Sequence, residues 1–355
     1  MRFLKSELEF LKVFGACADT RTFDGDKLFI ITKPELNRAY FGLFTDDVKM
    51  IQQIDCSVDD TFIMNINLVQ FNSMLSFCKD DELIEFNNGK IKFGETSEYD
   101  FETFDFNIQN FNDILNMPVE GNLFELKDIS KIDQISFSIG ADKEISCIAY
   151  QDNHFITYDS NILSFIKTDN NISENFYLPK IFYKLYQLYK FDTVNINKIS
   201  EQFFYMSINN MKIFMDIAEY SIPYIFSDDI KSKFEHQNKI VLNTDLFKNK
   251  LSRLKVLTQK TMYNRVFIYL NESEIKAEIK DDYKGHEFIV TGIDKDLVGT
   301  YFICNTTSLH SVLNNYNQES ITIKVSKDEM SVIKIEDEKN NINYVLTLYK
   351  KYEED

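Results

Sequence analysis

The fold is decided by the stretch at residues 303–335, ICNTTSLHSVLNNYNQESITIKVSKDEMSVIKI. It opens with the end of a strand and a capping residue, Asn305, and a helix follows. Apolar residues recur there at the spacing of one helix face: Leu309, Val312 and Leu313. A polar turn, a strand, the tight turn at 326–329 and a second strand complete the unit. We therefore predict a helix that buries its apolar face against an antiparallel sheet.

The same order of elements occurs twice more. The matching segments are INLVQFNSMLSFCKDDELIEFNNGKIKFG at 66–94 and YLPKIFYKLYQLYKFDTVNINKISEQFFYMSI at 177–208. Asn67 and Pro179 stand at the start of the predicted helices. The apolar residues at helical spacing are Phe71, Leu75 and Phe77 in the first segment, and Phe182, Leu185 and Leu188 in the second. Self-similarity of this kind indicates a repeated supersecondary unit.

A second set of helices precedes these segments. We predict them at SELEFLKVFGACADT (6–20), LKDISKIDQISFSIG (126–140) and NTDLFKNKLSRLKVLTQK (243–260). Short strands such as LFIIT, RVFIYL and IKAEI fill the intervals, and many of the predicted strands alternate polar with apolar residues. The order predicts an α+β fold of three repeated domains, each made of two βαβββ halves. The expected boundaries are 1–118, 119–236 and 237–355, with the helices lining a central hole and the sheets outside.

The basic residues gather on or beside these helices although the net charge is −17. On the helix at 243–260, only Asp245 opposes the cations. Acidic residues concentrate in connecting segments such as 80–82 and 98–105. Because phosphates attract Lys and Arg without regard to base sequence, we expect a DNA-facing surface. Its expected residues are Lys12, Arg21, Lys127, Lys131, Lys143, Lys180, Lys184, Lys190, Lys248, Lys250, Arg253 and Lys255. The alternative is that these are ordinary solvated helix faces.

Cysteine usage and the absence of long apolar runs indicate a cytoplasmic protein. The chain has an odd number of cysteines, five, and none lie at metal-ligand spacing. The N-terminus MRFLKSELEF lacks the apolar run of a signal peptide. No window of 18 uncharged apolar residues occurs, so no membrane span is expected.

No motif for catalysis, a cofactor or a metal is present. The histidines, His154, His236, His286 and His310, are scattered. The sequence has no Gly-rich phosphate loop and no GxSxG nucleophile motif. Acidic pairs such as Asp59-Asp60 lie in polar turns, which are usually solvated. We therefore expect a protein that is not an enzyme and that needs no cofactor.

Several segments resemble the bacterial DNA polymerase III beta subunit, the replicative sliding clamp. LPKIFYKLYQL resembles the segment that opens the second helix of its middle domain, and GTYFICNTTSLHSVLNNY resembles a segment of its third domain. SVIKIED followed by YVLTLYK resembles the closing strand pair. YSIPYIF is similar to the linker between domains two and three. ITYDSNIL stands where the family has Thr-Asp-Gly-His-Arg-Leu. The resemblance covers nearly the whole chain, and a divergent, phage-encoded clamp would fit it.

The resemblance implies a homodimer in which two chains pair head to tail around double-stranded DNA. It also implies that the DNA polymerase and the clamp loader dock through short peptides in an apolar pocket between domains two and three. The implied pocket residues are Tyr158, Ile162, Leu163, Pro223, Met330, Val332, Val345 and Thr347. The chain departs from the family at Ile162, where the family has Arg, and at Thr347-Leu348, where it has Met-Pro. A phage-encoded clamp would act in the host cytoplasm.

Two other classes remain open on the sequence. A β-rich structural or adhesive protein, such as a viral tail component, would explain the strands and the acidity. It would not explain three matched pairs of helices with basic faces. An enzyme with an unrecognised site is the second alternative.

Overall fold

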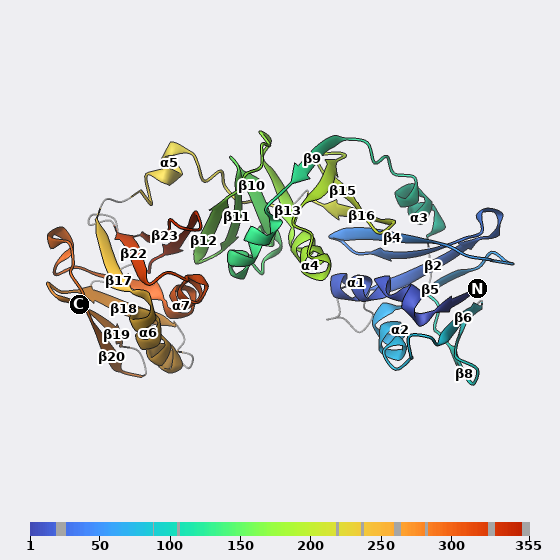
Figure 1. The fold of residues 1–355 in the computed structure, drawn as a ribbon, viewed down its shortest axis with the longest axis horizontal. Coiled ribbons are helices and arrows are strands. Elements are labelled where there is room, and N and C mark those ends of the chain that lie inside the picture. Colours follow the sequence, from blue (N-terminus) through green and yellow to red (C-terminus); the bar gives the residue numbers. More distant parts are fainter. Residues whose placement is uncertain are drawn as a thin grey trace. The chain divides into compact units, whose positions relative to one another are not determined.

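The computed structural model describes residues 1–18, 26–87, 89–104, 107–217, 220–235, 238–258, 264–280, 283–325 and 331–349. The chain divides into two compact units. Unit 1 comprises Met1–Leu126 and Leu178–Ala218, and unit 2 comprises Lys127–Tyr177 and Glu219–Asp355. Both are built on antiparallel sheets with helices packed against them (Figure 1).

Unit 1 contains an eight-stranded sheet and a four-stranded sheet. The large sheet runs in the order β5 (Ile63–Asn67), β2 (Lys27–Lys33), β3 (Arg38–Phe44), β4 (Val48–Asp55), β16 (Met211–Asp216), β15 (Phe203–Ile208), β14 (Val194–Lys198) and β9 (Asn122–Leu126). The small sheet runs β1 (Arg2–Leu4), β6 (Leu83–Asn87), β7 (Lys90–Phe93) and β8 (Ser97–Asp100). The helices are α1 (Phe10–Cys17), α2 (Leu68–Leu75), α3 (Ile108–Leu115) and α4 (Lys180–Tyr189).

Aromatic side chains fill both faces of the large sheet of unit 1. Phe41 on β3 is fully buried, and its ring lies 5.2 Å from that of Phe10 on α1. The neighbouring Tyr40 points to the opposite face, as strand alternation requires. There its ring lies 6.1 Å from Phe111 of α3. Helix α3 therefore covers the face of the sheet that α1 does not.

Unit 2 repeats this plan. Its large sheet runs β13 (Phe176–Pro179), β10 (Cys147–Gln151), β11 (His154–Asp159), β12 (Ile162–Lys167), β24 (Ile342–Thr347), β23 (Val332–Asp337), β22 (Ser320–Val325) and β17 (Lys239–Asn243). Its small sheet runs β20 (Gly285–Val290), β19 (Glu274–Ile279), β18 (Arg265–Leu270) and β21 (Tyr301–Asn305). The helices are α5 (Asp228–Lys231), α6 (Thr244–Thr258) and α7 (Thr306–Asn315), and α6 packs against α7.

The repeat predicted from the sequence extends to strand pairing. In chain order the described elements form successive groups of one strand, a helical segment and three strands, beginning at β1, β5, β9, β13, β17 and β21. The two large sheets join such groups in the same way, through β4 with β16 and through β12 with β24. The α+β fold with βαβββ halves is thus confirmed, whereas the three domain boundaries stay a prediction.

The segment predicted as a helix at 126–140 is not an α-helix. It forms two short 3-10 helices, Ile129–Gln134 and Ser136–Ser138. The Ile135 carbonyl accepts hydrogen bonds from the hydroxyls of Ser138 and Thr157, at 2.9 and 2.8 Å. In an α-helix, that carbonyl would accept a hydrogen bond from the backbone amide four residues later. Local hydroxyl bonds of this kind compete with helix formation.

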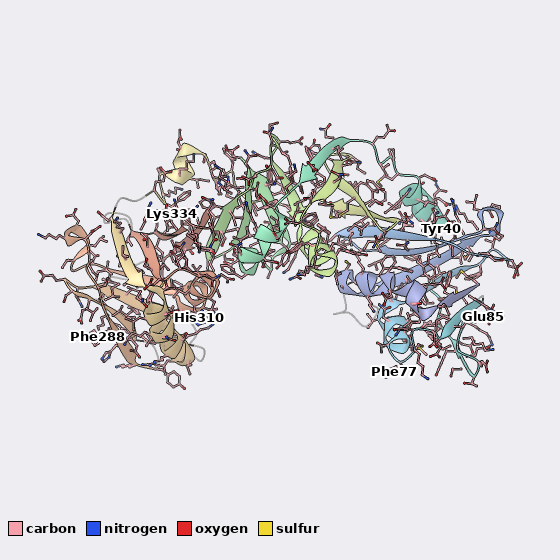
Figure 2. All side chains as sticks on the ribbon, in the orientation of Figure 1. Tyr40, Phe77, Glu85, Phe288, His310 and Lys334 are labelled. Atoms are coloured by element: carbon pink, nitrogen blue, oxygen red, sulfur yellow. The ribbon has the colours of Figure 1, made fainter. Side chains whose placement is uncertain are left out.

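Most of the predicted caps and apolar stripes are correct. The Asn67 and Asn305 side chains accept from the backbone amides of Gln70 and Ser308, at 2.9 and 3.0 Å. Two stripe residues were assigned wrongly. Phe77 is 89% exposed because α2 ends before it (Figure 2). Leu188, on α4, is 45% exposed.

Each small sheet ends in the last strand of a βαβββ group, β8 in unit 1 and β20 in unit 2, and the opposite end strands are β1 and β21. The outer edges of β8 and β20 pair with no other strand in the described part of the chain. Exposed apolar side chains lie on both strands. Tyr99 is 46% exposed on β8, and Val290 is 81% exposed on β20. Phe288, also on β20, is 42% exposed (Figure 2). In the large sheets, the last strands of the corresponding βαβββ groups pair with one another: β4 with β16, and β12 with β24. Unprotected edges of this kind are templates for pairing with another chain.

Candidate nucleic-acid interface and docking face

Helix α6 separates apolar and basic residues onto different faces. Its core stripe, Phe247, Leu251 and Leu254, is at most 2% exposed. This burial leaves the cations on the remaining faces of the helix: Lys248, Lys250, Arg253 and Lys255. The Asn243 side chain accepts from the Leu246 amide at 2.9 Å and so fixes the start of the helix.

Asp245 is not the only acid that faces these cations, contrary to expectation. Glu287, on β20, lies 2.8 Å from the Lys250 ammonium and 3.5 Å from the Arg253 guanidinium. The hydrogen bond from Lys250 is the main reason why the pKa of Glu287 is lowered. Helical periodicity could not reveal a partner on a strand. Lys248 and Lys255 make no ion pair with any carboxylate in the described part of the chain.

The lysines of α4 differ in their surroundings. Lys180 and Lys190 are exposed, and Lys190 lies over the Tyr186 ring at 5.1 Å. Lys184 is half-buried and donates to the Ala16 carbonyl at 3.2 Å, at the C-terminal end of α1. A cation there satisfies a terminal carbonyl and interacts favourably with the helix dipole. Lys184 thus ties α1 to α4.

The remaining predicted cations are spread over both units. Lys12 pairs with Glu9 at 3.0 Å, and Lys131 pairs with Asp128 at 2.8 Å. Lys127 and Lys143 are exposed. Arg21 lies outside the described residues. That these side chains face DNA stays a prediction.

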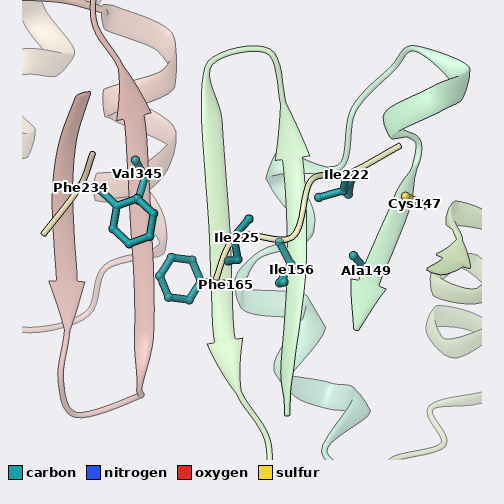
Figure 3. Packing of buried hydrophobic residues seen from close by; sticks show 8 residues of the cluster. All are labelled: Cys147, Ala149, Ile156, Phe165, Ile222, Ile225, Phe234 and Val345. Atoms are coloured by element: carbon teal, nitrogen blue, oxygen red, sulfur yellow. The ribbon is translucent and has the colours of Figure 1, made fainter. Parts of the chain in front are cut away.

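Part of the predicted peptide pocket forms one apolar surface on unit 2, which we call the docking face: Tyr158, Leu163, Val345 and Val332. Leu163 stands opposite both Tyr158 and Val345 in strand register. Val332 packs against the same cluster from β23. Beneath these residues lies a core that includes Ile156 and Phe165 (Figure 3). Tyr158, Leu163 and Val332 are only partly buried, so their apolar surface is available for contact.

The other predicted pocket residues differ in where they lie. Ile162 is 2% exposed and alternates to the opposite face of the sheet from Leu163. Thr347 is exposed beside Val332, and its hydroxyl donates to the Asn161 carbonyl at 3.2 Å. Pro223 is exposed on the linker that follows β16. Met330 lies outside the described residues.

The linker that crosses this sheet is held by a buried glutamine. Gln151 is only 3% exposed. Its side-chain amide donates to the Pro223 carbonyl at 3.2 Å and accepts from the Ile225 backbone amide at 3.0 Å. Ile222 and Ile225 then pack into the core beneath the linker (Figure 3). Sequence reasoning missed Gln151, although a lone amide after the apolar run CIAY was a signal that a polar partner was needed.

Replacing Gln151 by alanine is expected to lower the free energy of unfolding by about 2 kcal/mol. The change leaves the buried Ile225 amide and the partly buried Pro223 carbonyl of the linker without their side-chain partner. Urea titration with linear extrapolation measures the loss. The matched control is Gln70→Ala on an exposed helix position, which should change stability by less than about 0.5 kcal/mol. Equal losses in the two variants would contradict the role assigned to Gln151.

Three of the cysteines are buried. Burial raises the pKa of the Cys17, Cys147 and Cys304 thiols to about 12 in each case, which keeps them protonated and unreactive. No group of three or more His, Cys, Asp or Glu residues is placed to hold a metal within the described ranges. In the same ranges, no helix is long and apolar enough to cross a membrane.

Solved structures of similar architecture match the whole chain. The DNA polymerase III beta subunit of Pseudomonas aeruginosa superposes with a TM-score of 0.76 at 13% identity, covering 99% of this chain and 100% of its own. The chain has the sliding-clamp fold. The clamp of Caulobacter crescentus gives a TM-score of 0.76 at 14% identity, and that of Bacillus subtilis gives 0.75 at 14%, each covering 99% of both chains.

Comparisons with family models and with curated protein sequences do not find this similarity. No model of a known protein family matches the chain, and no curated protein matches it. The sliding-clamp fold is therefore retained at 12–15% identity. Apolar patterning, which many different side chains satisfy, suffices to specify such a fold.

Proposed function

We propose that the chain is a DNA sliding clamp, a processivity factor that encircles duplex DNA and tethers a replicative polymerase. The observation that carries the proposal is the match of the sliding-clamp fold over 99% of the chain, to proteins described as DNA polymerase sliding clamps. In this proposal the domains are 1–118, 119–236 and 237–355. The protein acts in the cytoplasm, or in the host cytoplasm if it is phage-encoded.

Ring closure requires a second copy of the chain. Two junctions within the chain pair equivalent strands, β4 with β16 and β12 with β24. If equivalent strands also pair between copies, β20 of one copy pairs with β8 of the other. The second contact, between β8 of the first copy and β20 of the other, closes the ring. Two copies in a closed head-to-tail arrangement pair both β8 edges and both β20 edges. The exposed Tyr99, Phe288 and Val290 support this assignment, since association would bury them.

The basic helix faces suit contact with DNA phosphates. Contacts of Lys and Arg with the backbone carry no sequence information, so the ring can slide. Topological closure, rather than tight binding, then keeps the protein on DNA. A tethered polymerase gains a high effective concentration of its template. The chain acts mechanically in this scheme and is not an enzyme; a separate clamp loader supplies the energy for opening.

The docking face suits capture of short apolar peptides from the polymerase and the loader. Its partly buried Tyr158, Leu163 and Val332 offer apolar area around a well-packed base. A Caulobacter crescentus clamp has been solved with polyethylene glycol bound at a proposed beta-motif tethering region. The absence of Ile162 from the docking face predicts that the peptide preference of this chain differs from that of clamps with Arg at this position.

Solution mass and a low-resolution image test the proposal together. A clamp should have about twice the chain mass of 41.8 kDa and should show a central hole wide enough for duplex DNA. A monomer without a hole would contradict the ring. A β-rich structural protein would instead give fibres or asymmetric assemblies.

A further inference from the structure

A histidine lies between the two helices that pack together in unit 2. His310 on α7 faces α6, and Figure 2 marks its position. Its Nε2 lies 3.0 Å from the Ser252 hydroxyl. Its Nδ1 lies 3.2 Å from the Lys255 ammonium and 3.0 Å from the Asn314 side-chain nitrogen. The imidazole is therefore engaged at both nitrogens.

These partners define which nitrogen carries the proton. The Ser252 hydroxyl donates its single hydrogen to the Lys248 carbonyl at 2.7 Å, so it must accept from Nε2. The Lys255 ammonium has no lone pair, so Nδ1 must accept from it. This second conclusion does not depend on how the Asn314 amide is oriented. His310 is thus neutral, with its proton on Nε2.

A neutral acceptor holds Lys255 without cancelling its charge. Lys250 and Arg253 share the Glu287 carboxylate, which offsets part of their attraction for an anion. Lys255 is half-buried and is fixed instead by an uncharged imidazole. An ammonium held in this way keeps its full charge and loses less side-chain entropy when it meets a phosphate.

We propose that His310 is a positioning residue that holds the Lys255 ammonium ready for a DNA phosphate. The inference rests on the proposed function of the basic face. It also gives the contact a pH dependence. An N–H on protonated Nδ1 would point at the ammonium, so protonation breaks the hydrogen bond and releases Lys255.

The direction of the pH effect follows from the surroundings of the ring. Burial, followed by the charges of Lys255 and Lys248, lowers the pKa of His310 below its ordinary value of 6.5. Among the described residues, the charged groups that act on the ring are these two lysines of α6. At neutral pH the ring is uncharged and the contact is intact. The contact is lost as the pH falls through the lowered pKa.

A double-mutant cycle on DNA binding tests the positioning. The measured quantity is the slope of the logarithm of the duplex binding constant against the logarithm of the salt concentration. In Lys255→Ala this slope should become shallower by about one unit. His310→Ala should give a smaller change of the same sign, and it should add nothing in the Lys255→Ala background. His310→Asn places Oδ1 near the position of Nδ1 and should restore the slope. Thermal unfolding of each variant confirms that it is folded.

Nitrogen-15 spectra of the imidazole provide a readout that needs no DNA. The proposal predicts a proton on Nε2 at neutral pH, and a rise in the pKa of His310 in Lys255→Ala. A proton on Nδ1, or independent effects of the two alanine variants on the slope, would overturn the positioning role. An unchanged slope in Lys255→Ala, with the predicted spectra, would instead refute the DNA contact and the proposed function of this face.

Discussion

Replacing Phe288 and Val290 together by aspartate is expected to convert a dimer into a folded monomer. Both side chains are exposed on the unpaired β20 edge, at 42% and 81%, so the isolated chain should tolerate the carboxylates. Burial of the carboxylates against β8 of a second copy would cost several kcal/mol. The dimer dissociation constant should rise by about 100-fold or more. Light scattering should then report a mass near 41.8 kDa instead of about twice that value.

Leu36→Asp is the matched control for this experiment. Leu36 is 48% exposed on a short 3-10 helix between β2 and β3 of the large sheet of unit 1, and it belongs to neither small sheet. Its substitution should leave the dimer mass unchanged. Persistence of the dimer in the Phe288 and Val290 variant would show that the copies associate through another surface.

Removing Lys248 and Lys255 is expected to weaken DNA binding more than removing Lys250 and Arg253, although each pair of alanine substitutions deletes two charges from α6. The second pair already shares Glu287 at 2.8 and 3.5 Å, whereas the first has no carboxylate partner in the described ranges. The salt dependence of duplex affinity should become shallower by about two units of slope for Lys248 and Lys255. The change should be clearly smaller for Lys250 and Arg253.

Lys324 and Lys334 provide a control away from α6. Both pair with Glu336 on adjoining strands of the large sheet of unit 2, at 2.6 and 2.7 Å. Their replacement by alanine changes the net charge by the same amount and should leave the salt slope unchanged. Equal effects of all three double variants would mean that overall charge, and not the α6 face, governs binding.

The features of this chain that were predictable from sequence depend on local periodicity. The stripe Leu309, Val312 and Leu313 predicted a helix because these residues recur at 3.6-residue spacing, and all three are buried. The Asn67 and Asn305 caps were predictable since a cap depends only on neighbours in the chain. Repetition of these local signals then indicated the βαβββ halves, and the family resemblance indicated the sliding-clamp fold.

The features that were missed depend on contacts between distant segments. Glu287 reaches Lys250 from another element, and Gln151 binds a linker 72 residues away through the Pro223 carbonyl. The 3-10 geometry near Ile135 depends on Thr157, which belongs to a later strand. Ile162 was assigned to the peptide pocket from the family resemblance, but strand alternation places it on the opposite face of the sheet from Leu163.

The central claim, that this chain works as a ring, is tested most directly by retention on DNA of different topology. Labelled protein is loaded onto nicked circular plasmid and separated from free protein by gel filtration, before and after the plasmid is cut once. The account predicts co-elution with the circle and loss of the protein after linearisation, because a ring slides off a free end. Equal retention on circular and linear DNA would contradict the account.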